Sequence, residues 1–236
     1  SVLQPGRDLV MSNVQHFGAK GDGLADDTEA IQHAVEQGDG LLAFPRGVYR
    51  IRRPITVELA RGRRIALSGD GGLATILMDA SGPAFHIVGT HDKTADPEGF
   101  STSVWDRERM PTITQLEIVG HHDQADGVRI EGTMQATLAG VLIRRCRHGV
   151  HLVKRNRNVL LSHCHVYHGR GAAIGVFYDR VNLHQSNIIG CHISYCKHAG
   201  IKIENSEVRN LQITGNDIEY NHDVGAELSA DVFIDS

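Results

Sequence analysis

One pattern of short apolar runs returns about every 25 residues through the second half of the chain. A first apolar column, with steps of 25, 23, 27 and 25 residues, consists of Ile118, Ile143, Val166, Ile193 and Ile218. A second column, with steps of 22, 24, 27 and 25 residues, consists of Ile130, Leu152, Val176, Ile203 and Leu228. A fixed period in the twenties, present in two columns, is typical of a solenoid.

The alternation inside each repeat indicates strands rather than helices. Each repeat holds two or three short runs in which apolar and polar residues alternate, separated by Gly, Asn or His. The frame of leucine-rich repeats, which share this period, is absent. Short strands joined by tight turns stack into coils, and each strand then lies about 4.8 Å from the same strand of the next coil. We therefore expect an all-β, single-stranded parallel β-helix.

The same alternation predicts which side chains face outward. Because neighbouring side chains of a strand point to opposite faces, Val166 points inward, and His165 and Tyr167 point outward. The predicted outward rows are Leu142, His165, His192 and Asp217, and then Arg144, Tyr167, Ser194 and Glu219. Near the following turn lie Arg145, His168, Tyr195 and Tyr220. An inward column of Val141, Cys164, Cys191 and Asn216 completes the pattern. Its cysteines are expected to be buried thiols, and its Asn is expected to hydrogen-bond a neighbouring coil.

Composition is compatible with one solenoid domain. Hydrophobic residues make up 41% of the 236 residues, and aromatic residues only 5%, which suits a narrow interior filled by Ile, Val and Leu. The net charge of −4 with neutral histidines gives no general attraction to nucleic acid. No run of about 18 apolar residues occurs, so no membrane span is predicted. The 15 histidines would gain charge near pH 6.

The N-terminal part contains the expected helix. Val14–Phe17 is predicted as a strand, and Thr28–Gln37 as a helix with an N-cap carboxylate from the preceding Asp26-Asp27 pair and an end at Gly38. This helix would cover the open end of the first coil. Asp22, Asp26 and Asp27 suggest calcium, but their spacing fits no EF-hand loop, so neither a cofactor nor a metal site is predicted.

These residues also carry a resemblance. The segment 14–23, Val-Gln-His-Phe-Gly-Ala-Lys-Gly-Asp-Gly, followed by Asp26-Asp27-Thr28 and Ala30-Ile31-Gln32, resembles the N-terminal signature of the pectate-lyase superfamily. It is most similar to the branch called pectate lyase 3 or rhamnogalacturonase/epimerase-like, whose next element resembles Phe44–Tyr49. The resemblance implies a right-handed β-helix, capped by the first helix. Its members include polysaccharide lyases, hydrolases, epimerases, and tailspike or adhesin domains. It is compatible with an extracellular or periplasmic location, although no signal peptide is visible.

The remaining segments set the domain limits. Residues 1–12 are interpreted as a leader, and residues 13–236 as the β-helix domain. Residues 91–110, which include Trp105, interrupt the rhythm as either a functional loop over one face or a disordered surface excursion. Asp231–Ser236 begins another strand without a capping element, so we expect a missing C-terminal cap or closure by another subunit, in a monomer or a homotrimer.

No active-site motif of the resembled family carries over. The hydrolase branch shows Asn-Thr-Asp, Asp-Asp, Gly-His-Gly and Arg-Ile-Lys, and here only the fragments His168-Gly169 and Ile201-Lys202 occur. The Asp-Pro-His motif of the alginate epimerase branch is absent. The candidate site therefore rests on the outward rows alone.

Two kinds of chemistry remain open for those rows. Elimination from a uronic-acid polymer needs a base at C5 and cations against the carboxylate. Hydrolysis needs two carboxyl groups, and Asp217 and Glu219 lie two residues apart on one strand. The catalytic candidates are His165, Tyr167, His192, Asp217 and Glu219. The substrate-binding candidates are Arg144, Arg145, His168, Tyr195 and Lys202.

The predicted function is that of a carbohydrate-active β-helix protein acting on a polysaccharide, with a uronic-acid glycan favoured. Both lyase and hydrolase chemistry are compatible with these residues. The alternative is a non-catalytic glycan-binding or structural module similar to a tailspike or adhesin, because a solvated β-helix face also carries polar rows.

Overall fold

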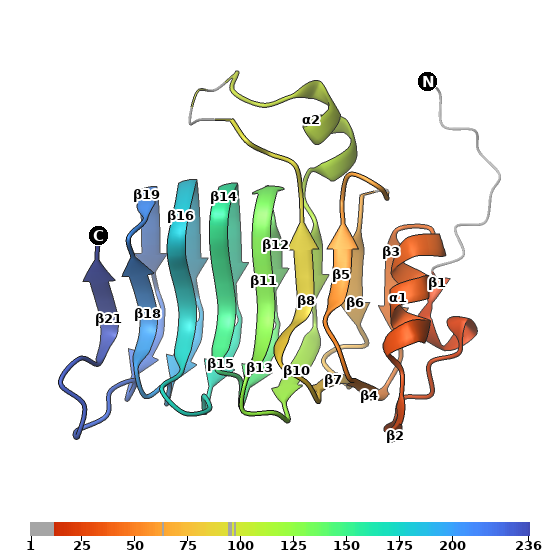
Figure 1. Ribbon diagram of the computed structural model, residues 1–236, viewed down its shortest axis with the longest axis horizontal. Coiled ribbons are helices and arrows are strands. Elements are labelled where there is room, and N and C mark those ends of the chain that lie inside the picture. Colours follow the sequence, from red (N-terminus) through yellow and green to blue (C-terminus); the bar gives the residue numbers. More distant parts are fainter. Residues whose placement is uncertain (1–11, 63, 94–95, 97) are drawn as a thin grey trace.

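The computed structural model describes residues 12–62, 64–93, 96 and 98–236, and they form a right-handed parallel β-helix (Figure 1). The strands belong to a 13-stranded sheet and an eight-stranded sheet, and every pairing within them is parallel. The larger sheet forms two sides of the β-helix. The first part of β14 pairs with β11 and its last part with β12, so one continuous strand runs over both sides. The prediction of a parallel β-helix is confirmed.

The strands follow one another in the same order in each coil. The eight-stranded sheet consists of β2 (Asp22–Asp26), β4 (Gly47–Ile51), β7 (Ala74–Met78), β10 (Leu116–Gly120), β13 (Leu142–Arg144), β15 (His165–Tyr167), β17 (His192–Ser194) and β20 (Asp217–Glu219). The first side of the larger sheet consists of β5 (Ile55–Glu58), β8 (Gly82–Val88), β11 (Ala125–Met134), β18 (Ala199–Glu204), β21 (Ala230–Asp235) and the first parts of β14 (His148–Ser162) and β16 (Ile174–Ile189). Its second side consists of β1 (Ser12–Asn13), β3 (Leu41–Phe44), β6 (Ala66–Gly69), β9 (Thr112–Thr114), β12 (Thr137–Ala139), β19 (Glu207–Thr214) and the remainders of β14 and β16.

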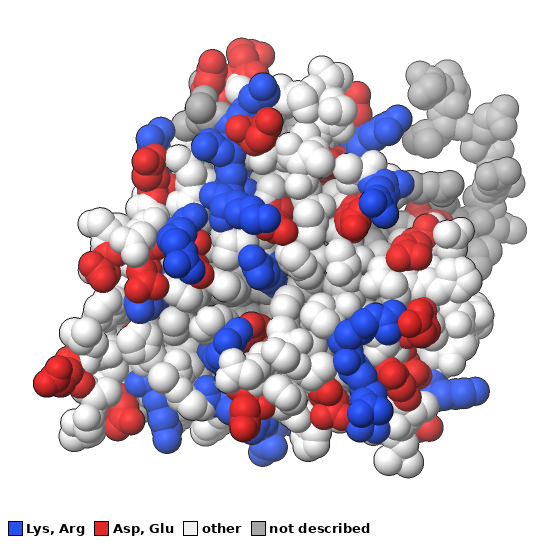
Figure 2. Space-filling model, in the orientation of Figure 1, with Lys and Arg blue, Asp and Glu red and all other residues white. Residues whose placement is uncertain are grey.

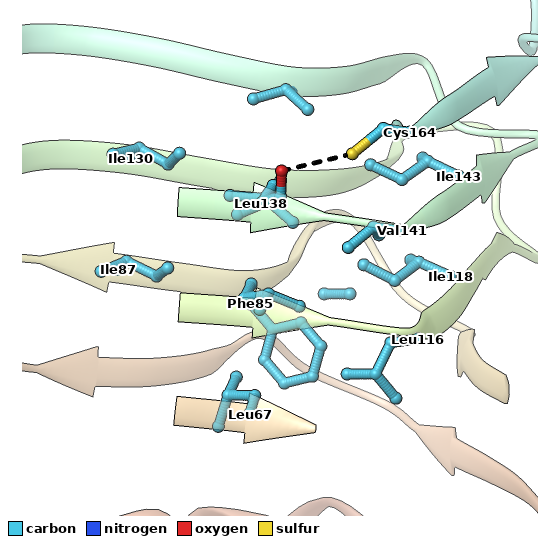
Figure 3. Packing of buried hydrophobic residues seen from close by; sticks show 14 of the residues in the cluster. Leu67, Phe85, Ile87, Leu116, Ile118, Ile130, Leu138, Val141, Ile143 and Cys164 are labelled. Atoms are coloured by element: carbon cyan, nitrogen blue, oxygen red, sulfur yellow. Dashed lines mark hydrogen bonds between the residues drawn. The ribbon is translucent and has the colours of Figure 1, made fainter. Parts of the chain in front are cut away.

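The first apolar column has the predicted register. Ile118, Ile143, Val166, Ile193 and Ile218 are stacked as direct partners in consecutive strands. The first four are buried, but Ile218 is only half-buried, because β20 pairs with β17 alone. Figure 3 shows the same kind of stacking inside the helix, with Ile118 below Ile143 and Ile87 beside Ile130.

The second apolar column was predicted with a wrong register. Leu152 stacks on Tyr178, which stacks on Ile203, and Val176 lies beside Ile201 instead. The longer turn between β15 and β16 shifts this coil by two residues, so Val176 remains buried on the same face. The partner of Ile203 in the next strand is Ile234, while Leu228 is exposed in a turn.

The N-terminal elements differ in detail from the prediction. Val14–Phe17 is a short 3₁₀ helix and not a strand, because the side chain of Asn13 accepts the backbone N–H of Gln15 and turns the chain. Helix α1 (Thr28–Gln37) is present with Asp27 at its N-cap position, but the Asp27 side chain makes no capping hydrogen bond. The carboxylate of Asp26 accepts the N–H of Thr28 at 3.1 Å. The Asp27 carboxylate accepts the N–H groups of Lys20 and Gly21 at 2.7 and 3.0 Å, and so holds the loop before β2.

Helix α1 lies at the N-terminal end of the coils, beside β3 and β5 (Figure 1). Its residues Ile31 and Ala34 are fully buried in the core. The side chain of Gln32 donates to Thr56 O and accepts from Thr56 N, both at 2.9 Å, and thus satisfies the backbone of β5. Ser12, which the sequence placed in the leader, pairs with Leu42 in β3, and residues 1–11 lie outside the described residues.

The interior polar and sulfur-containing residues follow the prediction. Cys164 and Cys191 are buried free thiols. Asn216 accepts the N–H of Cys191 at 2.8 Å and donates to Ile188 O at 2.9 Å, so its amide joins neighbouring coils as expected.

The segment between β8 and β9 projects from the side of the stacked coils, above β8 and β12 (Figure 1). It contains helix α2 (Thr102–Glu108), which begins after the N-cap Ser101. Glu108 is buried and accepts the N–H and hydroxyl of Thr90 at 3.0 and 2.7 Å, which closes the base of the segment. The interpretation as a disordered excursion is therefore wrong for this helix, while residues 94, 95 and 97 lie outside the described residues.

Candidate functional site

The predicted catalytic residues share the outward face of the eight-stranded sheet. His165, His192 and Asp217 are direct partners in one row, and Tyr167 and Glu219 lie in the next row on either side of Ser194. The rings of His165 and His192 are 5.7 Å apart, and Nε2 of His192 is 2.9 Å from Oγ of Ser194. Asp217 and Glu219 are exposed, and no ion pair joins either of them to a histidine of the described chain.

Three of the predicted substrate-binding residues line one hollow on this face. Arg144, Arg145 and His168, together with Gly169 and Arg170, enclose a volume of about 440 Å³. Nε of Arg144 is 2.7 Å from Oε1 of Glu117, so one of these guanidinium groups has a carboxylate partner. Tyr195 stacks on His168, with ring centres 4.7 Å apart.

Lys202 does not belong to this face. It lies in β18 of the larger sheet, because Ile201 and Ile203 on either side of it point into the core there. Nζ of Lys202 is 3.0 Å from Nε2 of His198 and 5.7 Å from the ring centre of Phe177. The structure therefore separates Lys202 from the other predicted binding residues.

A second group of functional side chains, not predicted from the sequence, lies on the first side of the larger sheet. We call it the histidine–carboxylate cluster, and its members are His86, Asp126, Glu131, His148, His151 and Asp179. Nε2 of His151 is 2.9 Å from Oδ2 of Asp179, and Nε2 of His86 is 2.9 Å from Oε1 of Glu131. The three carboxylates are all buried, at 3% exposure for Asp126 and 7% each for Glu131 and Asp179.

Ring stacking fixes the orientation of the central histidines. His151 is the direct partner of Phe177 in β16, and their rings are stacked 5.1 Å apart with 6° between the planes. The ring of His148 contacts both, at 4.9 Å from His151 and 5.2 Å from Phe177. The imidazole of His151 is therefore held between the carboxylate of Asp179 and two aromatic faces.

Cationic side chains hold all three carboxylates in place. Nε of Arg180 lies 3.1 Å from Oδ1 of Asp179. Asp126 receives Nε and Nη2 of Arg147 at 3.0 and 2.8 Å, and it also accepts the backbone N–H of His148 at 3.0 Å. Nζ of Lys154 is 2.6 Å from Oε2 of Glu131. A register shift between Val153 and Lys154, with Lys154 at a positive φ of 60°, marks a β-bulge next to the cluster.

Arg129 occupies the middle of the cluster. It is the direct partner of His86 on one side and of His151 on the other. Its Nε is buried and makes no hydrogen bond within the described residues. Figure 2 shows Lys and Arg side chains gathered on this side of the molecule, below the projecting segment.

The electrostatics of the cluster keep its histidines neutral. Burial lowers the pKa of His148 to about 4, and burial also lowers the pKa values of His86 and His151, against the opposing effects of Glu131 and Asp179. Burial raises the pKa of Glu131, but the hydrogen bond from Lys154 and the positive charges of Lys154 and Arg129 oppose it, and the net shift is downward. At neutral pH the cluster therefore pairs ionised Glu131 with neutral imidazoles.

A neutral His151 has one ring nitrogen available as a base. A carboxylate oxygen accepts hydrogen bonds, so we assign the proton of this contact to Nε2 of His151, which donates it to Oδ2 of Asp179. The lone pair then lies on Nδ1, which is the arrangement that orients a general base.

The cluster borders a hollow beneath α1. The hollow has a volume of about 750 Å³, and His86 contributes to its lining together with Gln32 of α1 and Thr56, Glu58 and Arg61 of the β5 region. The cluster and the hollow therefore share the side chain of His86.

The sequence did contain a signal for this cluster. Glu131, Asp179 and Glu204 belong to one outward row, because Val153 pairs with both Glu131 and Asp179, and Asp179 pairs with Glu204. The incorrect register of the second apolar column hid this row, since the coil carrying Asp179 was placed two residues out of step.

Two wider observations concern the described residues only. They contain no cluster of three or more His, Cys, Asp or Glu side chains arranged to hold a metal ion. None of their helices has the length and apolarity required to cross a membrane.

Comparison with known proteins agrees with this architecture. The family model described as rhamnogalacturonase A/epimerase, pectate lyase-like, matches residues 11–108, and the model described as a right-handed β-helix region matches residues 102–234. Alginate lyase 7 of Azotobacter vinelandii is 33% identical over 105 residues, covering 36% of this chain and 12% of that protein. The chain thus spans only a small part of this curated relative.

Two solved structures share the fold at low sequence identity. The A-module of the mannuronan C-5 epimerase AlgE4 of Azotobacter vinelandii has a TM-score of 0.56 and 18% identity, covering 84% of this chain and 59% of that one. The catalytic unit of the GH87 α-1,3-glucanase of Streptomyces thermodiastaticus has a TM-score of 0.55 and 15% identity, covering 96% of this chain and 43% of that one. With more than half of its length matched by the β-helix model, the chain belongs to the right-handed β-helix family and is pectate-lyase-like.

Proposed function

We propose that this chain acts on a polysaccharide containing uronic-acid units, and that the histidine–carboxylate cluster removes the proton at C5 of a bound unit. The observation that supports the proposal most strongly is the contact of 2.9 Å between His151 and Asp179, in which a partly buried imidazole with a lowered pKa is oriented by a carboxylate. The relative named as an alginate lyase, whose printed name describes action on a uronic-acid polymer, is in accord with it.

The proposed step uses three groups. The guanidinium of Arg129, whose Nε has no hydrogen-bond partner in the described residues, neutralises the carboxylate of the sugar, which acidifies the proton at C5. Nδ1 of His151 takes that proton, and Asp179 stabilises the imidazolium that forms. The electron pair of the C5–H bond forms a C4–C5 double bond, the C4–O4 bond breaks, and the departing O4 takes the proton from His151. Return of a proton to C5 from the opposite side would instead invert that carbon.

Hydrolysis is less well supported by these side chains. An acid-assisted hydrolysis needs a protonated carboxyl group, usually one with a raised pKa. The pKa of Glu131 is lowered, Asp126 is held by Arg147, and Asp179 accepts from His151. Proton abstraction therefore fits the cluster better than glycoside hydrolysis.

The exposed rows of the eight-stranded sheet remain the site predicted from the sequence, with His165, Tyr167, His192, Asp217 and Glu219 as its catalytic candidates. Their partners differ from those of the cluster, because His192 shares a hydrogen bond with Ser194 and not with a carboxylate. One set of variants tests both sites.

The experiment offers polygalacturonate, alginate and an α-1,3-glucan to the wild type and to the variants His151→Gln, Arg129→Gln and His192→Ala. Unsaturated uronate is followed by its ultraviolet absorbance, new reducing ends by a colorimetric assay, and inversion at C5 by proton NMR. We expect unsaturated or C5-inverted product from a polyuronate, and a loss of about 100-fold or more in both cluster variants.

Three outcomes would contradict the proposal. Reducing ends without unsaturated uronate would indicate a hydrolase. A loss confined to His192→Ala would place catalysis on the eight-stranded sheet. Retention of glycans without any product would favour the alternative of a binding module.

A further inference from the structure

One bend of the β-helix carries large side chains in a left-handed backbone conformation. Arg145, His168, Tyr195 and Tyr220 follow the strands of the eight-stranded sheet in four consecutive coils, and their φ angles are 57°, 50°, 56° and 54°. We call these four residues the turn column. Each would be the natural place for Gly or Asn, because larger side chains are strained at positive φ.

Other bends of the same β-helix include residues that the backbone prefers. One of them holds Gly140, Gly190 and Gly215 at φ values between 61° and 64° besides Gln115 and His163, and another holds Asn158 and Asn210, both at 54°, besides Gln135 and Gln185. The aromatic rings of the turn column are therefore not required by the fold. A bend that large side chains occupy in four consecutive coils, with neither Gly nor Asn among them, points to a role in binding.

The rings of the turn column form a regular stack. The rings of His168 and Tyr195 are 4.7 Å apart with 3° between their planes, and those of Tyr195 and Tyr220 are 5.7 Å apart with 5° between them. Tyr195 and Tyr220 are nevertheless 44% and 58% exposed. Because the inner faces cover each other, the stack presents ring edges and phenol hydroxyls to the solvent in a line that crosses the coils.

The stack ends at the hollow of about 440 Å³ that Arg144, Arg145, His168, Gly169 and Arg170 enclose. Arg144 is paired with Glu117, and Arg170 lies 3.7 Å from Asp123 and donates to the backbone oxygens of Gly120 and Arg145. The guanidinium of Arg145 has no hydrogen-bond or ion-pair partner in the described part of the chain. An uncompensated positive charge therefore lies next to the row of hydroxyl groups.

We propose that the turn column and this hollow form a second carbohydrate-binding surface, which holds an anionic polysaccharide away from the histidine–carboxylate cluster. Arg145 binds a carboxylate or sulfate group of the polymer. The hydroxyl groups of Tyr195 and Tyr220 hydrogen-bond to the ring substituents of successive sugars.

A nucleic acid fits this surface less well. Binding of single-stranded nucleic acid relies on open aromatic faces on which bases stack, and the inner faces of this stack are already covered. The net charge of −4 also opposes a polymer with a charge on every unit. The proposal concerns binding, so it does not rest on the catalytic step proposed above.

The variants that test the surface follow from the backbone geometry. Asn is well suited to positive φ, so the double variant Tyr195→Asn/Tyr220→Asn removes both rings without disturbing the bend. Arg145→Gln removes the unpaired charge, and Gln115, Gln135 and Gln185 already occupy comparable positions at positive φ. His163→Asn is the matched control, because His163 is an exposed ring at a φ of 52° in a neighbouring bend.

The measurement is the dissociation constant for polygalacturonate and for a sulfated glycan, with a neutral α-1,3-glucan and single-stranded DNA for comparison. We expect binding of at least one anionic polysaccharide, weakened tenfold or more by the double variant and by Arg145→Gln, and unchanged by His163→Asn. Equal affinity in the double variant and the wild type would overturn the proposal, as would equal or tighter binding of the neutral glucan or of DNA. A wild type that binds no anionic polysaccharide would also overturn it.

This result can be separated from the catalytic proposal. Binding is measured a second time in the His151→Gln background, where the proposed base is absent. Weakening by the turn-column variants in that background supports the second surface, whether or not the wild type yields any product.

Discussion

Nε2 of His151 lies 2.9 Å from Oδ2 of Asp179, although the two residues are 28 positions apart and belong to adjacent coils. The contact is diagonal, because the direct partner of His151 is Phe177, and Asp179 is two residues further along the same outward face. The pair therefore exists only when the two coils are stacked in this register. It links the chemistry of the candidate site directly to the geometry of the β-helix.

Replacement of Asp179 by Asn should change both the titration and the activity of the site. Asp179 is a group that raises the pKa of His151 against the effect of burial, so the pKa of His151 should fall further in Asp179→Asn. The amide no longer fixes the tautomer, and we expect turnover to drop at least tenfold. NMR titration and the unsaturated-uronate assay measure the two effects.

The matched control is Glu204→Gln, which removes a carboxylate from the same row one coil further on. It should leave the pKa of His151 where it is in the wild type. A rise in that pKa in Asp179→Asn would show that the 2.9 Å contact is not what sets the protonation of His151.

Stability should fall as the pH is lowered through the titration of the buried histidines. The pKa of His148 is lowered from 6.5 to about 4, so the unfolded chain binds its proton at a higher pH than the folded chain does. The contribution of neutral His148 to the free energy of unfolding is complete above about pH 6.5, declines below that pH, and is lost near pH 4. Its total is on the order of 3 kcal/mol. His86 and His151 act in the same direction.

Urea unfolding at pH 7 and pH 5 tests this dependence. The wild type should have a lower free energy of unfolding at pH 5, and His148→Asn should show a smaller difference between the two pH values. If the variant and the wild type lose the same free energy, the burial of His148 is not what destabilises the protein in acid.

The sequence predicted the fold because a β-helix repeats its physical constraints in every coil. The column from Ile118 to Ile218 could be recognised because each member must be apolar to fill the same narrow interior. The second column failed at Val176, where the longer turn before β16 adds two residues that periodicity alone does not reveal, and at Leu228, whose predicted place next to Ile203 is taken by Ile234. The prediction of a strand at Val14–Phe17 was wrong for a similarly local reason, because the side chain of Asn13 accepts the N–H of Gln15 and turns the backbone there.

The candidate site was harder to predict, because it depends on contacts between different coils. His151 and Asp179 look unrelated in the sequence, and only the stacked register brings them within hydrogen-bonding distance. Lys202 was grouped with the other binding candidates because its motif fragment was considered without its strand, β18, which lies in the larger sheet. The outward row of His165, His192 and Asp217 was predictable, since it needed only alternation and the first column.

Along the first apolar column, the stability lost when an Ile is truncated to Ala should depend on how deeply that side chain is buried. Ile193 is 1% exposed, whereas Ile218 is half-buried in the same column. Ile193→Ala removes side-chain atoms from a closed interior and should cost about 2–5 kcal/mol, while Ile218→Ala should cost clearly less. Chemical denaturation of both variants makes the comparison, and equal costs would show that the two positions are packed alike.

The last prediction concerns the polar residue that supports the β-bulge beside the candidate site. Asn156 is 1% exposed, and its Oδ1 accepts the N–H and the hydroxyl of Thr133 at 3.1 and 2.8 Å. Its Nδ2 donates to Ile130 O and Val153 O at 3.3 and 3.1 Å. Asn156→Ala leaves these buried groups without partners, which should cost at least about 2 kcal/mol.

The same change should reach the site, because the bulge that Asn156 supports begins at Lys154, whose Nζ lies 2.6 Å from Glu131. We therefore expect turnover to fall in Asn156→Ala under conditions where the variant is still folded by circular dichroism. Asn187→Ala is the control, because Asn187 lies in the adjacent strand and its side chain makes no hydrogen bond to the described residues. It should change stability by no more than about 0.5 kcal/mol. If Asn156→Ala loses stability but keeps its turnover, the bulge at Lys154 does not contribute to the activity of the site.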